Sequence, residues 1–118
     1  MSIAKNYVLV EVPRVPSVQV AEALCRAMDE ALKTSRLRAV LFDTRCTEMP
    51  PRDANAYIWE WTRRGVHHDV AAIVVKSELL KVSGNMTAIS KGVQLRSFHE
   101  LNDAELFIRR KLGRSQVS

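Results

Sequence analysis

The sequence predicts an α/β fold, in which a four-stranded, mainly parallel sheet alternates with helices (β-α-β-α-β-α-β-α). Two short and almost uninterrupted apolar runs carry this prediction, LRAVLFDT at 37–44 and VAAIVV at 70–75. Such runs are typical of strands that are buried on both faces of a parallel sheet. The segments around them have the three- and four-residue apolar spacing of amphipathic helices. Alternation of this kind indicates parallel strands joined by right-handed crossovers.

The first half of the chain supplies two strands and two helices. Residues 7–12 form the first strand, and Ser17 is a good N-cap for a helix that runs to about Thr34. The stripe of this helix that faces the core comprises Ala21, Leu24, Cys25, Met28, Ala31 and Leu32. After the strand at 37–44, a second helix is expected over 52–64 and ends at Gly65. Its buried stripe should comprise Ala54, Tyr57, Ile58 and Trp61.

The second half is less regular. Residues 77–90 have a helical pattern, but Ser83-Gly84-Asn85 predicts that the helix is broken or short, since glycine costs about 1 kcal/mol relative to alanine. Residues 93–98 alternate as an edge strand does. Asn102, followed three residues later by Glu105, predicts the capped start of a last helix that reaches about residue 111.

The length of 118 residues indicates a single domain, with its core over about 7–112 and a flexible tail over 113–118. No apolar run approaches the roughly 20 residues that cross a membrane, and no signal-peptide pattern opens the chain. We therefore expect a cytoplasmic protein.

The net charge of +5 is concentrated at the C-terminal end. Four of the positive charges belong to Arg109, Arg110, Lys111 and Arg114, and the remainder of the chain sits near +1. A basic helix end is ordinarily a solvated feature that the helix dipole favours. An anionic partner at this end of the chain, either nucleic acid or an acidic membrane surface, is the least favoured alternative.

The sequence contains no recognisable catalytic or cofactor signature. Its four glycines, at 65, 84, 92 and 113, do not form a phosphate-binding loop. His67 and His68 are adjacent, so they point to opposite sides of an extended chain and are poorly placed to share a metal; we expect both to face solvent. The prediction is a protein that is not an enzyme and that has no cofactor and no metal.

The loop that follows the strand at 37–44 is the main candidate site, because open α/β folds bind ligands at the carboxyl ends of their strands. Asp43 begins this loop, and Thr44 and Thr47 precede the helix at 52–64. A phosphate on either threonine would meet the positive end of the helix dipole, although both hydroxyls can instead cap the backbone. Asp53 lies in the first turn of that helix.

Two further residues of the helix at 52–64 are candidates. Trp59 lies off the apolar stripe and Arg63 is on the same exposed side. An off-stripe tryptophan either covers neighbouring side chains or belongs to a partner surface.

The chain resembles the STAS/SpoIIAA-like family, the fold of bacterial anti-sigma factor antagonists. The similar segments are VLVEV at 8–12, RAVLFDT at 38–44, VAAIVV at 70–75 and VQLRSFHELNDAELFIRRKL at 93–112. The resemblance implies a cytoplasmic domain that binds proteins, such as a kinase or an anti-sigma-like regulator, often under control of phosphorylation. Family antagonists carry an Asp-Ser-Ser-Gly motif where this chain reads TRCTEMPPRDAN. The chain is thus closer to a branch without that motif, for which lipid or other apolar ligands are suggested.

Two hypotheses follow. The first is a non-enzymatic protein-interaction module, and a candidate homodimer, that uses the 43–53 loop and the exposed side of the helix at 52–64. The second is a small-ligand or lipid-binding domain, or a weak enzyme, that uses a crevice near Asp43, Cys46 and Lys76.

Overall fold

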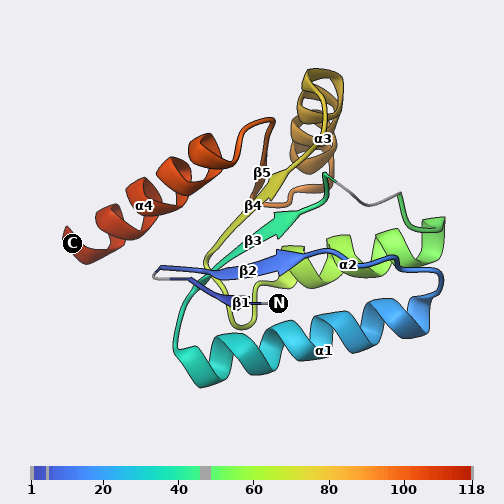
Figure 1. The fold of residues 1–118 in the computed structure, drawn as a ribbon, viewed down its shortest axis with the longest axis horizontal. Coiled ribbons are helices and arrows are strands. Elements are labelled where there is room, and N and C mark those ends of the chain that lie inside the picture. Colours follow the sequence, from blue (N-terminus) through green and yellow to red (C-terminus); the bar gives the residue numbers. More distant parts are fainter. Residues whose placement is uncertain (1, 5, 46–48, 118) are drawn as a thin grey trace.

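Figure 1 shows a five-stranded sheet with helices on both of its faces. The computed structural model describes residues 2–4, 6–45 and 49–117, and side chains as far as residue 113. The strands are β1 (Ser2–Ile3), β2 (Val8–Glu11), β3 (Ala39–Asp43), β4 (Val70–Val74) and β5 (Leu95–Phe98). The helices are α1 (Val18–Ser35), α2 (Arg52–Arg64), α3 (Glu78–Lys91) and α4 (Leu101–Val117).

The strands lie in the order in which they occur along the chain, β1-β2-β3-β4-β5. The four longer strands are parallel, as in the register Val8↔Val40 and Val40↔Ala71. The α/β class and the alternation of strands with helices are therefore confirmed. The sheet is mixed, however, because β1 pairs with β2 in the antiparallel direction. A two-residue strand is too short to leave an apolar pattern, so the predicted number of four strands omitted it.

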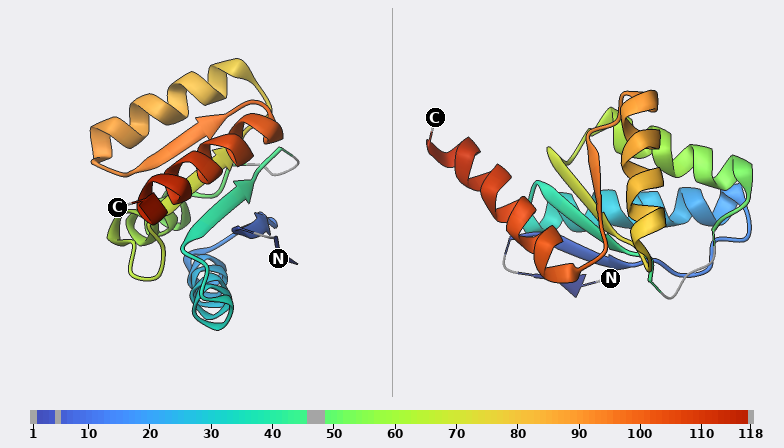
Figure 2. Two further views of the ribbon diagram at one scale, coloured as in Figure 1. Left: turned by 90° about the vertical axis from the view of Figure 1, so that its left-hand side faces the viewer. Right: turned by 90° about the horizontal axis from the view of Figure 1, so that it is seen from above.

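The helices cover the sheet unequally (Figures 1 and 2). α1 and α2 pack side by side on one face, α4 lies on the opposite face over β4, and α3 packs mainly against β5 at the edge of the sheet. Parallel strands in sequential order, joined by right-handed crossovers, direct their connecting helices to the same side of a sheet. α4 follows the last strand and is free to cover the other side.

Burial on both faces explains the apolar run of β3. Val40 and Phe42 pack toward α1 and α2, whereas Ala39 and Leu41 pack toward α4. All four are at most 4% exposed. The expected stripe of α1 is also confirmed at the buried Ala21, Cys25, Met28 and Leu32.

The helix boundaries agree closely with the sequence for α1 and α2. Ser17 Oγ accepts a hydrogen bond from Val20 N (3.4 Å), and Gly65 ends α2 in the left-handed region (φ 53°). Tyr57, which was expected in the buried stripe, is 38% exposed. Trp61, which was also expected in this stripe, is partly buried against the core, and its indole Nε1 donates to Asp29 on α1 (3.1 Å).

Two predictions for the later helices were wrong. α3 is unbroken across Gly84, because the close contact of the helix with β5 outweighs the low helix propensity of glycine. α4 begins at Leu101, so Asn102 lies inside the helix and is not its cap, and the helix continues to Val117.

The expectation that His68 faces solvent was also wrong. His68 is 5% exposed; its ring lies 4.7 Å from the Trp61 ring, centroid to centroid. The Nε2 atom lies 3.1 Å from the carbonyl oxygen of Thr62, a geometry that fits an Nε2–H donor, while the buried Nδ1 has no hydrogen-bond partner among the described residues. Burial lowers the pKa of His68, and this effect outweighs the opposing contribution of the Thr62 carbonyl.

The lowered pKa of His68 predicts that the protein loses stability in mild acid. The folded-state pKa lies below the ordinary value of 6.5, so below about that pH the unfolded chain binds more protons than the folded chain. The stabilisation is therefore complete above this pH and is lost as the pH falls. Urea denaturation at about pH 7.5 and about pH 5.5 should show a smaller free energy of unfolding at the lower value.

His68→Phe keeps a ring against Trp61 and removes the titrating group, so it should weaken this pH dependence, at a cost of about 1 kcal/mol at neutral pH for the lost hydrogen bond. His67→Gln is the matched control and should behave as the wild type. An unaltered pH dependence in His68→Phe would show that another group is responsible.

Candidate functional site

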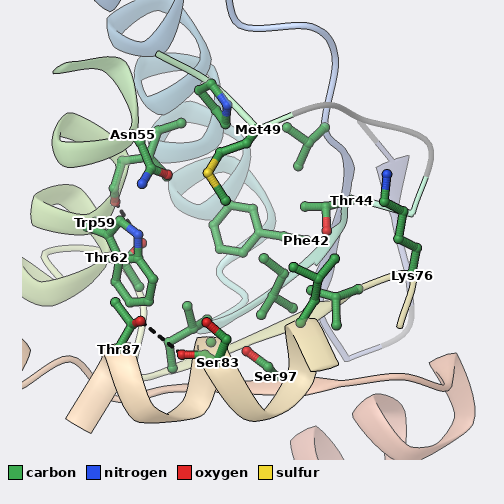
Figure 3. Close-up of a pocket in the computed structure, with 18 of the residues that line it drawn as sticks. Phe42, Thr44, Met49, Asn55, Trp59, Thr62, Lys76, Ser83, Thr87 and Ser97 are labelled. Atoms are coloured by element: carbon green, nitrogen blue, oxygen red, sulfur yellow. Dashed lines mark hydrogen bonds between the residues drawn. The ribbon is translucent and has the colours of Figure 1, made fainter. Parts of the chain in front are cut away.

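A cavity of about 440 Å³ opens between α2 and α3, at the carboxyl ends of the parallel strands (Figure 3). This volume lies within the range of roughly 300–1,000 Å³ that is usual for small-molecule sites. The residues that line the cavity come from the strands, both helices and the loops that follow β3 and β4. They are Val12, Leu24, Phe42, Thr44, Met49, Pro50, Asn55, Ile58, Trp59, Thr62, Ile73, Val75, Lys76, Leu80, Ser83, Gly84, Thr87, Leu95 and Ser97.

The interior of the cavity is mainly apolar. Phe42, Ile73 and Leu95, from three neighbouring strands, provide the floor. Trp59 stands on the α2 wall, and in Figure 3 its ring, the Met49 side chain and the Phe42 ring all point into the space. Surfaces of this kind bind the apolar part of a ligand through the hydrophobic effect.

Few polar groups line the cavity. Those on the two helices include hydroxyl groups, whereas the rim carries a charged lysine. On α3, the Thr87 hydroxyl donates to the Ser83 carbonyl (2.9 Å), and on α2 Thr62 donates to the Ile58 carbonyl (2.9 Å). The donor hydrogens of these hydroxyls are therefore used within their own helices, and only their oxygen lone pairs remain for a ligand. Lys76 follows β4 and brings a positive charge to the rim of the cavity, which Thr44 also lines (Figure 3).

The cavity exists because α3 is fixed to the edge of the sheet, away from α2. Asn85 Oδ1 accepts from the backbone N of Ser97 (2.8 Å), and Asn85 Nδ2 donates to the Ser97 carbonyl (3.4 Å). A Cβ atom at Gly84 would overlap Ser97 Oγ, so a larger residue at this position would force the Ser97 side chain to shift, whereas glycine permits the approach of helix to strand as it stands. From the sequence alone, Gly84 was predicted to break or shorten the helix, and this packing role was not predicted.

The residues at the carboxyl end of β3 form a small polar network. The Asp43 carboxylate pairs with Arg45 at 2.8 and 3.0 Å, and this hydrogen-bonded contact lowers the pKa of Asp43 against the opposing effect of burial. Thr44 Oγ1 donates to the carbonyl of Val74 (2.8 Å), and the Thr44 N–H donates to the same carbonyl (3.0 Å). The Thr44 hydroxyl thus ties β3 to β4, the backbone role that was one of its two predicted alternatives.

The other predicted site residues are not gathered in one place. Asp53 is exposed at the start of α2, where its Oδ1 accepts from the N–H of Ala54 (2.8 Å). Arg63 is exposed near the end of α2 and pairs with Glu60. Trp59 is half-buried and lines the cavity. Thr47 and Cys46 lie outside the described residues.

No sequence motif predicted the cavity. Lys76 was singled out because it ends a strand and Thr44 because it precedes the helix at 52–64. The apolar lining residues resemble ordinary core residues in sequence. Their common surface appears only when α2 and α3 are placed in space. The helical spacing of Ser83 and Thr87 on α3 is the one signal that could have suggested a less apolar wall.

Comparison of the chain with protein-family models, with curated proteins and with solved structures finds no match. Among the described residues, no helix has the length and apolar character that crossing a membrane requires. Over the same residues, no group of three or more His, Cys, Asp or Glu side chains is arranged to hold a metal ion.

The contact between Gly84 and Ser97 can be tested by substitution. Gly84→Ala would ordinarily stabilise a helix by about 0.5–1 kcal/mol, but here we expect it to destabilise the protein by about 1–3 kcal/mol, because the added methyl group overlaps Ser97 Oγ. Thermal or urea denaturation measures the difference.

Gly113→Ala is the matched control, because Gly113 also lies in a helix and has open space around its would-be Cβ atom; this variant should be stabilised. Ser97→Ala in the Gly84→Ala background should recover part of the loss. Stabilisation of Gly84→Ala to the same extent as Gly113→Ala would contradict the close contact.

Proposed function

We propose that this protein is a non-enzymatic binding domain whose cavity between α2 and α3 accepts a small apolar molecule with an acidic group. The observation that carries the proposal is a cavity of about 440 Å³ with an apolar interior and a lysine at its rim. The apolar body of the ligand would lie against Phe42, Trp59 and Ile73. Its acidic group would face Lys76.

Charge at the rim supports an acidic ligand. Lys76 is exposed and has no carboxylate partner among the described residues, so a bound anion would not have to displace one from them. The carboxylate of Asp43, at the end of β3, is already engaged by Arg45. An exposed ammonium group attracts an anion only modestly in water, and the apolar contacts would supply most of the affinity.

Two fluorescent probes of similar shape test the proposal: anilinonaphthalene sulfonate, which is anionic, and phenylnaphthylamine, which lacks the sulfonate. We expect both to bind, and Lys76→Gln to weaken the anionic probe by roughly threefold to tenfold while leaving the neutral probe unchanged. Lys91→Gln, a substitution of an exposed lysine outside the cavity, is the control for net charge.

A pair of exposed serines on α3 tests the location. Ser83 lines the cavity and Ser90 does not, so Ser83→Trp should fill the space and abolish binding of both probes, whereas Ser90→Trp should leave it intact. If Ser83→Trp and Ser90→Trp bind the probes equally, the ligand does not enter this cavity and the proposal fails.

A second candidate function is the protein-interaction and regulatory role that the resemblance to STAS/SpoIIAA-like domains implies, in the cytoplasm and with a kinase or an anti-sigma-like partner. It is favoured by Met49, a residue that lines the mouth of the cavity on the segment leading into α2 and is 78% exposed. Exposed methionines adapt to the shapes of different partners. The alternation of parallel strands and helices supports the family resemblance itself.

Mass spectrometry of the tagged protein isolated from its own host tests this second role. We expect a stoichiometric partner that persists in moderate salt, and no phosphate on Thr44, because its hydroxyl is held by the Val74 carbonyl. Met49→Glu should release the partner, and Val66→Glu, at an exposed apolar residue beyond the other end of α2, should retain it. Phosphate on Thr44, or loss of the partner in both variants, would contradict this assignment.

A further inference from the structure

α3 carries a row of large apolar side chains that face solvent. Leu79 is 79% exposed, Val82 51%, Met86 66% and Ile89 81%. The only residue of this helix that is fully buried is Ala88. Contiguous exposed apolar surface of this kind marks an interaction site more often than a chance arrangement does. We refer to these four residues as the α3 stripe.

The α3 stripe lies on the side of the helix opposite its contact with the sheet. A turn of 100° per residue places the four side chains around one line, about half a turn away from Gly84 and Ala88. Their spacing of three, four and three residues is that of a coiled-coil seam, in which one helix packs along another. The stripe is therefore shaped for a helix and does not face the cavity.

The α3 stripe is symmetric about position 84. Leu79 and Ile89 are equally distant from this position, and so are Val82 and Met86. When two copies of α3 pack in antiparallel fashion about a two-fold axis, Leu79 meets the partner's Ile89 and Val82 meets the partner's Met86. Each apolar residue then has an apolar partner, and a two-fold interface of this kind closes on itself.

The flanks of the α3 stripe do not oppose such pairing. Ser83 and Ser90 border it on one side, and Lys81 and Lys91 lie on the parts of the helix turned away from it. Glu78, at the first turn, is already paired with Lys81 (2.9 Å). In two copies, the eight stripe side chains would bury on the order of 1,000 Å² in total, which is about the least that a specific interface requires.

From this symmetry and area we propose that the protein forms a homodimer in which the α3 helices of two copies pack antiparallel through Leu79, Val82, Met86 and Ile89. The occupant of the stripe is a second copy of this chain. The inference goes beyond the proposed ligand site and does not depend on it, because the stripe and the cavity lie on different sides of α3.

Analytical ultracentrifugation of the full chain over a wide concentration range tests the dimer. We expect a reversible monomer–dimer equilibrium, and we expect Val82→Glu or Met86→Lys to raise the dissociation constant at least about tenfold by placing a charge against an apolar side chain. Leu106→Glu alters a residue that is 45% exposed on α4 and should leave the equilibrium unchanged. A wild-type chain that stays monomeric throughout overturns the proposal.

Mixing the two single variants tests the antiparallel register. In the mixed pair the glutamate of one copy meets the lysine of the other, and the second contact remains Val82 against Met86, so the mixture should form heterodimers although each variant alone is monomeric. A parallel pair would align Val82 with Val82 and gain nothing from mixing. A mixture that stays monomeric therefore overturns the antiparallel pairing.

Circular dichroism should show that both variants keep the fold, because the substituted side chains are exposed. Binding of the neutral probe phenylnaphthylamine should also persist in both variants. If the variants lose the dimer and still bind the probe, the dimer interface is supported independently of the ligand site. If the wild type is dimeric and does not bind the probe, the proposed ligand site fails and the dimer proposal stands.

Discussion

The contact between α3 and the free edge of β5 is the constraint on which the functional features of this fold depend. An edge strand exposes backbone groups that must be satisfied, and here the Asn85 amide satisfies the N–H and the carbonyl of Ser97 as a neighbouring strand would. Gly84 lets the helix come close enough for this. Because α3 is held at the edge, it leaves a cavity on the side toward α2 and an apolar row on the side toward solvent.

Much of the fold could be predicted because its causes are local in sequence. β3 is buried on both faces, so it must be an apolar run, and an apolar run of that length is recognisable without knowledge of its neighbours. The same is true of α1, where one face of the helix alone contacts the sheet, and of α2, where Gly65 supplies the left-handed conformation that ends it. The two-residue β1 has no such local cause and was not predicted.

The failures share a different origin, since each depends on contacts between segments that are distant in the chain. The continuity of α3 through Gly84 depends on Ser97, and the burial of His68 depends on Trp61 and on the turn at Gly65. Sequence reasoning placed Asp43 and Thr44 correctly at the carboxyl end of a central strand, but it could not show that Arg45 and Val74 already occupy their polar groups. Trp59 was recognised as unusual, yet its direction depends on the space between two helices.

α3 belongs both to the cavity and to the α3 stripe, and this shared position has a thermodynamic consequence. With Ala88 as its only fully buried residue, the helix is held chiefly by its contact with β5, so any movement of α3 would alter this contact and one wall of the cavity. Pairing of α3 with a second copy would restrict that movement and fix one wall of the cavity. If pairing changes the affinity for a ligand in the cavity, the ligand must change the affinity of pairing by the same factor, because the coupling free energy is reciprocal. Ligand binding and dimerisation would then be thermodynamically linked, because both would depend on the position of α3 relative to β5.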